Sequence, residues 1–195
     1  SYLIMQSTIN NHYTKLADKT ILITGSNGFL GKKLLSFIVD ILNHLHKKHL
    51  STNHKIYAID NCITSIAESK DYPPYVECIE ANAITFDYSQ LNSVDYVIHA
   101  AGLASPSQYR KYPIETIDVA VSLTRTLLDR SLNWKSKFIF FSSSEIYGNP
   151  DSLNIPTKED YNGYVSTLGP RACYDESKRL GETLCYVYNQ YHGIS

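Results

Sequence analysis

The sequence predicts a doubly wound α/β fold built on a parallel sheet. Strand-length apolar runs alternate with stretches of helical periodicity along most of the chain. The first run ends in a glycine-spaced loop that opens the first helical stretch, and the loop reads Thr24-Gly25-Ser26-Asn27-Gly28-Phe29-Leu30-Gly31. Strands that alternate with helices in this way form parallel sheets covered by helices on both faces. No internal repeat or low-complexity linker divides the sequence.

The elements can be predicted in order. The first strand is predicted at Thr20–Thr24 and the first helix from Leu30 to about Leu45. Four further strands are predicted at Lys55–Asp60, Tyr75–Ile79, Val94–His99 and Phe138–Phe141. Between the last two strands, a helix opened by Pro113 is predicted to run through Ile117, Val121 and Leu128. The last helix is predicted from Tyr174 to about Tyr191.

The composition favours neither a nucleic-acid-binding protein nor a membrane protein. The chain has 195 residues, 43% of them hydrophobic, and a formal net charge of -1 without a long Lys/Arg block. We therefore expect no nucleic-acid partner and no membrane partner, and the many tyrosines are expected in the core and at interfaces rather than under bases. Four cysteines without Cys-x-x-Cys spacing and no secretory leader predict a reduced, cytoplasmic protein. The longest apolar runs are too short to span a bilayer.

The glycine loop and Asp60 together predict a dinucleotide site that favours NAD. Gly25 permits the tight turn, Gly28 lets the backbone approach the pyrophosphate, and Gly31 permits close helix packing. Asp60, at the end of the second strand, can accept hydrogen bonds from the adenosine ribose and would repel the 2′-phosphate of NADP. The alternative is that Asp60 only caps the next turn.

Two segments outside this motif carry their own expectations. The first is residues 1–18, where Met5, Ile9, Tyr13 and Leu16 stand at helical spacing and predict an added amphipathic extension. It is expected to pack on its own domain, with a partner surface as the alternative, and residues 19–195 are expected to form one NAD-binding Rossmann-like domain. The second is the cluster His44, His46 and His49, which reads either as a metal site or as a solvated helix end. We favour the helix end and expect no metal.

Tyr174 and Lys178 stand four residues apart and predict hydride chemistry on the bound dinucleotide. On a helix this spacing puts both side chains on one face, where the ammonium favours the ionised phenolate. An ordinary tyrosine is a poor base at neutral pH. Tyr-x-x-x-Lys alone is common by chance, but here it follows a glycine loop and the hydroxyl-rich turn Phe141-Ser142-Ser143-Ser144-Glu145-Ile146-Tyr147-Gly148.

Three segments carry a family resemblance that covers about residues 19–193. They are Ser142–Gly148, the stretch Gly169-Pro170-Arg171-Ala172-Cys173-Tyr174-Asp175-Glu176-Ser177-Lys178-Arg179, and Ala104-Ser105-Pro106 after His99-Ala100-Ala101. The sequence resembles the extended short-chain dehydrogenase/reductases that act on nucleotide sugars, the NAD-dependent epimerase/dehydratase family. Within this family it is most similar to the UDP-glucuronate decarboxylases, lyases that make UDP-xylose. The resemblance implies a homodimer that pairs through the helices starting near Pro113 and Tyr174. It also implies a sugar-binding C-terminal region, before which this sequence stops.

The resemblance implies a role for each site residue. Tyr174 would take the proton of the sugar 4-hydroxyl, Lys178 would hold the nicotinamide ribose, Ser143 would hydrogen-bond the 4-oxygen, and Glu145 would handle a proton or water. The residues expected to bind the cofactor are Gly25, Asn27, Gly28, Phe29, Leu30, Gly31, Asp60, Asn61, Asn82, Ala83, Ala100, Ala101, Tyr174 and Lys178. Those expected near the sugar or its diphosphate are Ser105, Tyr109, Ser144 and Arg171.

Two positions favour decarboxylation among the family's reactions. The related 4,6-dehydratases carry an aspartate where this sequence has Ser144, and simple 4-epimerases generally lack the following Glu145. A dehydratase or an epimerase remains the alternative. A third possibility, from another class, is a catalytically weak NAD-binding dimerisation module. It is suggested by Ala120, which stands where the family usually has asparagine, and by the missing C-terminal region. Three further departures leave the choice of substrate open: Leu123 for a usual glycine, Asn82 for a common aspartate, and Gly102-Leu103 for Ser-Pro.

Overall fold

The computed structural model of the protein describes residues 12–63 and 71–195. Their strands form one parallel sheet in the order β3-β2-β1-β4-β5. The strands are β1 (Thr20–Thr24), β2 (Lys55–Asp60), β3 (Val76–Glu80), β4 (Tyr96–His99) and β5 (Lys137–Phe140). The prediction of a doubly wound α/β fold is therefore confirmed.

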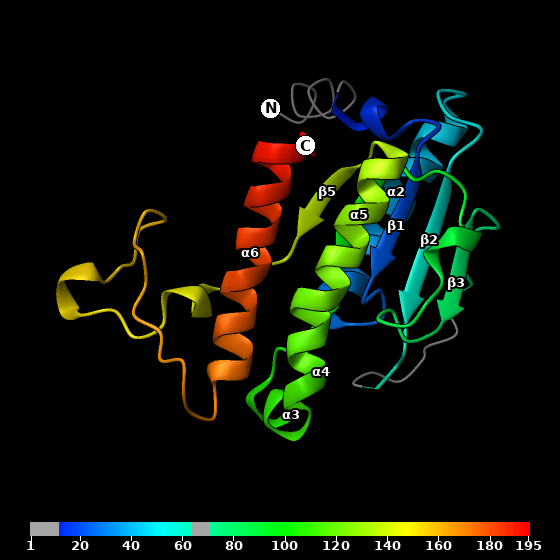
Figure 1. Ribbon diagram of the computed structural model, residues 1–195. Coiled ribbons are helices and arrows are strands. Elements are labelled where there is room, and N and C mark those ends of the chain that lie inside the picture. Colours follow the sequence, from blue (N-terminus) through cyan, green and yellow to red (C-terminus); the bar gives the residue numbers. More distant parts are fainter. Residues whose placement is uncertain (1–11, 64–70) are drawn as a thin grey trace.

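Helices cover both faces of the sheet (Figure 1). They are α2 (Phe29–Lys47), α3 (Pro106–Lys111), α4 (Pro113–Asp118), α5 (Thr124–Trp134) and α6 (Ala172–His192). A π-helical turn, Val119–Leu123, joins α4 to α5 into one continuous rod. In Figure 1, α6 runs beside this rod, and the segment between β5 and α6 projects away from the sheet.

The alternation of side chains along the strands builds two separate cores. Ile21 and Ile23 of β1 pack on one face with Leu35 and Leu42 of α2. Leu22, between them in sequence, points to the opposite face and packs in a cluster with Leu127 of α5. Because successive strand residues point to opposite faces, one strand can bind a helix layer on each side. The central strands β1, β2 and β4 are thereby buried on both faces, as in most parallel sheets, whereas the edge strands β3 and β5 are partly exposed.

The predicted element bounds agree with the structure most closely at the centre of the sheet. The bounds predicted for β1 and β2 match the observed ones, whereas β3 and β5 are shifted by one residue and β4 begins later than predicted. The short helix α3 was not predicted. It starts at Pro106, and Pro113 begins the next helix, because proline is tolerated in the first turn of a helix.

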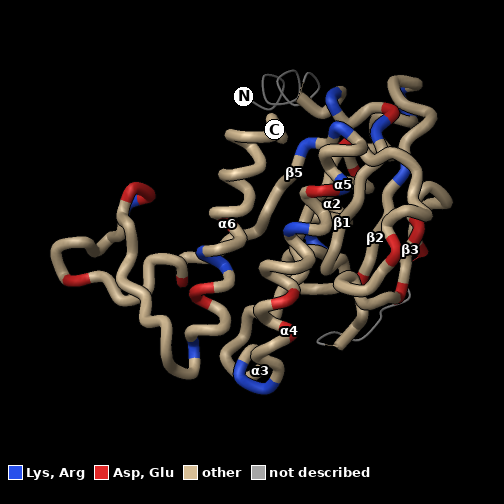
Figure 2. Tube along the Cα trace, viewed as in Figure 1, with Lys and Arg blue, Asp and Glu red and all other residues tan. Residues whose placement is uncertain are grey.

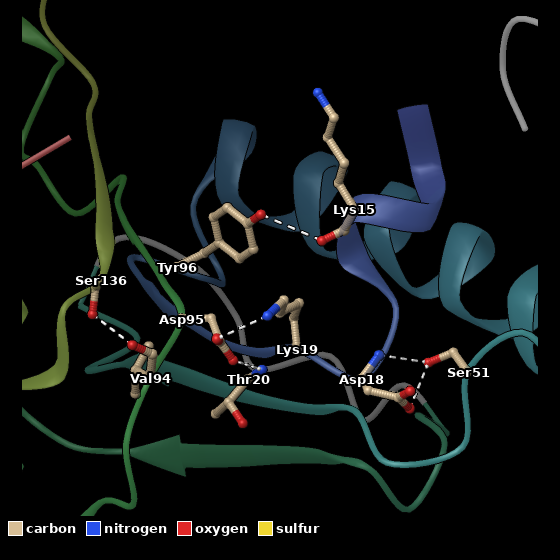
Figure 3. A network of polar contacts seen from close by, with 9 residues as sticks. All are labelled: Lys15, Asp18, Lys19, Thr20, Ser51, Val94, Asp95, Tyr96 and Ser136. Carbon is tan, nitrogen blue, oxygen red and sulfur yellow. Dashed lines mark hydrogen bonds and ion pairs between the residues drawn. The ribbon is translucent and has the colours of Figure 1, made fainter. Parts of the chain in front are cut away.

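The described part of the N-terminal extension packs on its own domain. Tyr13 and Leu16 contact the α2-side core, while Met5 and Ile9 lie outside the described residues. Figure 3 shows the polar contacts that accompany this packing at the amino-terminal edge of the sheet. Asp95 is the centre of these contacts, because its Oδ2 accepts from the Thr20 amide at 2.9 Å and its Oδ1 from Lys19 Nζ at 3.3 Å. Tyr96 donates to the backbone oxygen of Lys15 at 3.3 Å.

Charges are distributed over many elements rather than gathered on one surface. Figure 2 shows basic and acidic residues along the strands, helices and connecting segments of the described chain. In the described ranges, no group of three or more His, Cys, Asp or Glu could hold a metal ion. Among the helices of the described residues, none is both long and apolar enough to cross a bilayer.

Candidate active site

The glycine loop is held against the end of β2 and against the segment that follows β4. Gly25 has φ +74°, a left-handed conformation, and its amide donates to the Ile59 backbone oxygen at 2.8 Å. A Cβ at Gly25 would lie 2.5 Å from the Ala101 Cα, and one at Gly31 only 2.0 Å from the Gly25 oxygen. At Gly28 the nearest atom would be the Gly25 oxygen at 3.3 Å, so the space beside Gly28 is comparatively open. These distances agree with the separate roles predicted for the three glycines.

Asp60 joins the glycine loop to the turn after β2. Its Oδ2 accepts from the Asn27 amide at 2.8 Å, and its Oδ1 accepts from the Cys62 amide at 2.8 Å. The carboxylate therefore caps the following turn, as the alternative interpretation required, and also fixes the glycine loop. Each oxygen keeps a lone pair for a further donor.

A cavity opens at the carboxyl edge of the sheet, between β1, β2 and β4. In parallel α/β sheets ligands bind at this edge, where the strand order reverses. Eight of the predicted cofactor residues line the cavity: Gly25, Gly28, Asp60, Asn61, Asn82, Ala83, Ala100 and Ala101. The remaining six, Asn27, Phe29, Leu30, Gly31, Tyr174 and Lys178, are not among the residues that line it. The sequence interpretation did not include eight others that do: Ile59, Ile63, Ile84, Gly102, Leu103, Tyr112, Glu115 and Val119.

Tyr174 and Lys178 are both buried on the inner side of α6. Tyr174 is 6% exposed and Lys178 is 5% exposed. The Tyr174 ring stacks on that of Tyr109 at 5.1 Å between centroids, with an angle of 16° between the planes. Tyr109, expected near the sugar, is thus a buried neighbour of the tyrosine and belongs to α3, which the sequence interpretation missed.

Lys178 reaches from α6 toward the cavity. Its Nζ donates to the Phe141 backbone oxygen at 2.7 Å and lies 4.7 Å from the centre of the Phe140 ring. A Cβ built on Gly102, which lines the cavity, would lie 3.6 Å from the same Nζ. Burial lowers the pKa of Lys178 to about 8, so the group stays mostly protonated at neutral pH. A cation therefore stands close to Gly102 on the cavity wall.

His99 connects the end of β4 to the π-helical turn. Its Nε2 lies 3.0 Å from the Val119 backbone oxygen and its Nδ1 lies 2.8 Å from Thr24 Oγ1. Because a carbonyl oxygen only accepts, Nε2 carries the hydrogen and Nδ1 accepts from the threonine. Burial, with a smaller contribution from the Lys178 charge, lowers the pKa of His99 to about 3, so the ring is neutral. Ala120, where the family usually has asparagine, is 3% exposed in this turn.

The hydroxyl-rich turn after β5 forms a short 3-10 helix over Ser144–Tyr147. Ser143 precedes it, and its Oγ accepts from the Glu145 amide at 3.2 Å. The Glu145 carboxylate pairs with the guanidinium of Arg171, which also lies 3.5 Å from Asp175 Oδ2. The structure places Arg171 against Glu145, and its expected contact with the sugar or its diphosphate stays a prediction. Ser105 precedes α3 on the surface, where its hydroxyl contacts that of Ser107.

The family assignment follows from comparison with known proteins. The family model described as "NAD dependent epimerase/dehydratase family" matches residues 21–195. The chain belongs to this family. One curated member, UDP-glucuronic acid decarboxylase 1 of Danio rerio, is 34% identical over 179 residues, which are 90% of this chain and 39% of that protein. The expected resemblance to UDP-glucuronate decarboxylases is thereby confirmed.

Solved structures of family members share the fold. A UDP-N-acetylglucosamine 4-epimerase from Methanobrevibacter ruminantium, in complex with UDP-N-acetylmuramic acid, superimposes with a TM-score of 0.72 at 26% identity. It matches over 91% of this chain and 53% of its own. UDP-glucuronic acid 4-epimerase from Bacillus cereus, in complex with NAD, gives a TM-score of 0.67 at 25% identity, over 90% of this chain and 53% of that one. The chain thus spans about half the length of these family members, or less.

Proposed function

We propose that the protein is an NAD-dependent nucleotide-sugar enzyme that converts UDP-glucuronate to UDP-xylose by decarboxylation through a 4-keto intermediate. The observation that carries the proposal is the pair Tyr174 and Lys178, both buried and one helical turn apart on α6, with the lysine ammonium close to Gly102 on the wall of the dinucleotide-type cavity. The turn after β5 adds Ser143 and Glu145 at the amino end of the same helix, through the ion pair with Arg171.

The residues of the cavity fit NAD. The opening beside Gly28 leaves room for a pyrophosphate next to backbone amides at the start of α2. Asp60 has acceptor capacity left for the adenosine ribose, and Asn82 and Ala83 lie on the cavity wall where the adenine would be held. When bound, NAD supplies a reversible acceptor for the hydride of the sugar C4. This is the cofactor for which the B. cereus epimerase provides a solved example.

The three polar side chains would divide the handling of the 4-hydroxyl. Tyr174 takes the proton of this hydroxyl as the C4 alcohol is oxidised to a ketone, and returns it when the ketone is reduced. The Lys178 ammonium has hydrogens left for the nicotinamide ribose, since one of its three is used by the Phe141 oxygen. Ser143 uses one lone pair for the Glu145 amide, and its hydroxyl hydrogen can be donated to the sugar 4-oxygen.

A ketone at C4 is what allows the carboxylate to leave. The C5 carboxylate is then a β-keto acid, so the bond between C5 and the carboxyl carbon breaks and its electron pair forms an enolate on the 4-oxygen. Carbon dioxide leaves, and a proton added at C5 restores the ketone before it is reduced to the product alcohol. Glu145 is the carboxylate placed to move that proton or a water that supplies it.

Decarboxylation is favoured over the neighbouring reactions by Ser144 and Glu145. A dehydratase needs an acid to protonate the leaving 6-hydroxyl, and Ser144 is a poor acid at the position where those enzymes carry aspartate. 4-Epimerisation is the second candidate reaction, because the chain is about a quarter identical to two solved 4-epimerases. A third candidate is an NAD-binding module of weak activity that acts by dimerising, because Ala120 stands where the family usually has asparagine.

The product mass distinguishes these candidates. The whole protein is incubated with NAD and a panel of nucleotide sugars that includes UDP-glucuronate, and the products are weighed by mass spectrometry. Loss of carbon dioxide supports the proposal, loss of water indicates a dehydratase, and an unchanged mass with a changed chromatographic position indicates an epimerase. No change in any substrate would favour the non-catalytic module.

Tyr174→Phe tests the assignment of the base. Removing the phenol oxygen should lower turnover about 10²- to 10⁴-fold, the range typical of a lost general acid or base, while NAD still binds. Tyr186→Phe, on the same helix but 64% exposed, is the matched control and should leave turnover unchanged. Equal turnover in the Tyr174→Phe and wild-type proteins would show that another group takes the proton.

A further inference from the structure

Asp175 is a buried carboxylate that the mechanism above does not use. It follows Tyr174 on α6 and is 7% exposed. Its Oδ2 lies 3.5 Å from Arg171 Nε, and its Oδ1 is buried without a hydrogen-bond partner in the described part of the chain. Charged carboxylates are rarely buried unless they are paired, and an unsatisfied buried oxygen is destabilising. The position of Asp175 therefore requires an explanation beyond packing.

Arg171 connects Asp175 to Glu145. Arg171 precedes Asp175 by one helical turn, and its Nε faces the Asp175 carboxylate while its Nη2 pairs with the Glu145 carboxylate. The guanidinium is planar and its donors have a fixed geometry. Fixing the Nε side of the group consequently orients the Nη2 side. The three charged side chains form a row that runs from Asp175, on the buried side of α6, through Arg171 to Glu145 in the turn after β5.

The three side chains are buried to different extents, and the most buried one, Asp175, is the fixed end of the row. The side chains of Arg171 and Glu145 are 47% and 37% exposed, whereas that of Asp175 is 10% exposed. An exposed ion pair on its own is weak and samples several rotamers. Asp175 is the most buried of the three, so its rotamer is the one most restricted by surrounding packing. Burial raises the pKa of Asp175, and the Arg171 charge opposes this change only in part.

We infer that Asp175 is a positioning residue that acts through Arg171 to hold the Glu145 carboxylate in the geometry needed for protonation at C5. The inference rests on the proposed function, in which Glu145 moves the proton that replaces carbon dioxide. It also accounts for Arg171 lying against Glu145 rather than free for a diphosphate. Asp175 does not touch the reacting atoms, and Tyr174, although adjacent in sequence, serves a different step of the reaction.

Asp175→Asn in the whole protein tests this role, because the amide keeps the shape of the side chain and removes the charge. Two readouts separate the steps with UDP-glucuronate and NAD. The first is the rate at which absorbance of the reduced nicotinamide appears in a single turnover, which reports oxidation at C4. The second is the rate at which the decarboxylated product forms, which includes protonation at C5 and the return of the hydride.

The expected result is a selective loss. Product formation should slow on the order of 10²-fold, the effect of a catalytic group misplaced by about 1 Å, and the oxidised intermediate should accumulate. Oxidation at C4 and the affinity for NAD should stay within a few-fold of the wild type. Glu176→Gln, the same change of charge one residue along and on the side of α6 that lines a different cavity, should affect neither step.

Three outcomes would overturn the inference. Equal slowing of both steps together with a lower melting temperature would reduce Asp175 to a structural role, and an unchanged product rate would remove it from the site. The third comes from a double-mutant cycle of unfolding free energy with Glu145→Gln and Asp175→Asn, in which additive effects would show that Arg171 transmits nothing. This cycle needs no turnover, so it tests the connection even if the wild type forms no decarboxylated product and the proposed function itself fails.

Discussion

At the residue scale, Lys178 combines a positive charge with a buried position. The proposed function needs a protonated ammonium beside Tyr174, yet Lys178 is 5% exposed and its ammonium lies against the Phe140 ring. Burial lowers the pKa of Lys178 from 10.5 to about 8. The folded protein therefore carries the desolvation cost of a cation for the sake of the site, as is common for buried charges at functional sites.

Lys178→Met is expected to stabilise the fold while abolishing turnover. Below pH 8 the lysine is protonated in both the folded and unfolded states, so its full desolvation cost, up to about 3 kcal/mol, is present. Between about pH 8 and pH 10.5 the unfolded chain binds the proton more tightly, so the stability of the wild type rises with pH. The difference in unfolding free energy between Lys178→Met and wild type should consequently shrink across this window. Denaturant titrations at several pH values measure it.

The matched control for this prediction is Lys48→Met, at an exposed position just after α2. It should change the unfolding free energy by less than about 0.5 kcal/mol at every pH. A Lys178→Met protein that is less stable than the wild type at pH 7 would contradict the prediction. It would mean that the bond from Nζ to the Phe141 oxygen outweighs the desolvation.

Asp60 has two functions that substitution can separate. Asp60→Ala should weaken NAD binding about 10-fold or more, because it removes a charged acceptor for the ribose and releases the Asn27 and Cys62 amides. Titration calorimetry with NAD checks this, and circular dichroism confirms that the variant is folded. Asp87→Ala, which removes another carboxylate that accepts from the amide two residues on, is the control and should leave NAD affinity unchanged. Equal affinity in the Asp60→Ala protein would exclude Asp60 from the site.

At the scale of elements, Gly28 and Gly31, where β1 leads into α2, are expected to have different roles. Gly31→Ala should lower the unfolding free energy by about 1–3 kcal/mol, because its Cβ would overlap the Gly25 oxygen and the loop must shift. Gly28→Ala should lower the unfolding free energy less than Gly31→Ala, since its Cβ meets one atom, the Gly25 oxygen at 3.3 Å, which must move by only a few tenths of an ångström, but it should lose NAD affinity if pyrophosphate approaches there. Denaturant titration and calorimetry on the two variants test this. Similar stability in both would contradict the assignment.

Sequence periodicity predicted the elements well where a local pattern determines them. Thr20–Thr24 and Lys55–Asp60 are central, buried strands with turn residues at their ends, and their bounds match. The helix from Pro113 was predicted as one element, and periodicity contained no sign of the π-helical turn within it. That turn includes Val119, whose oxygen accepts from His99 of β4, a contact between residues 20 positions apart. A tertiary hydrogen bond of this kind leaves no mark on the local pattern.

The same distinction separates the predictable part of the site from the rest. The glycine loop and Asp60 could be predicted because the chemistry of phosphate and ribose binding uses a short motif at the end of a strand. The contact of Arg171 with Glu145 joins segments 26 residues apart and could not be read from spacing. The stacking of Tyr109 on Tyr174 likewise depends on α3, an unpredicted helix. Tertiary placement, rather than residue type, determines these roles.

At the scale of the whole molecule, the homodimer implied by the family resemblance stays a prediction with a defined surface. On α4, Ile114 and Ile117 are 65% and 38% exposed, and on α6 Leu180 is 46% exposed, although α4 and α6 pack together on the same side of the sheet. Exposed aliphatic residues on neighbouring helices suit an interface. Ile117→Glu should therefore convert a dimer to a monomer in light scattering, because a buried, unpaired carboxylate opposes association. Leu50→Glu, at a residue that is 49% exposed just after α2 on the opposite side of the sheet, should leave the dimer intact. A wild-type protein that is monomeric at all concentrations would contradict the prediction, and dimers of both variants would move the interface to another surface.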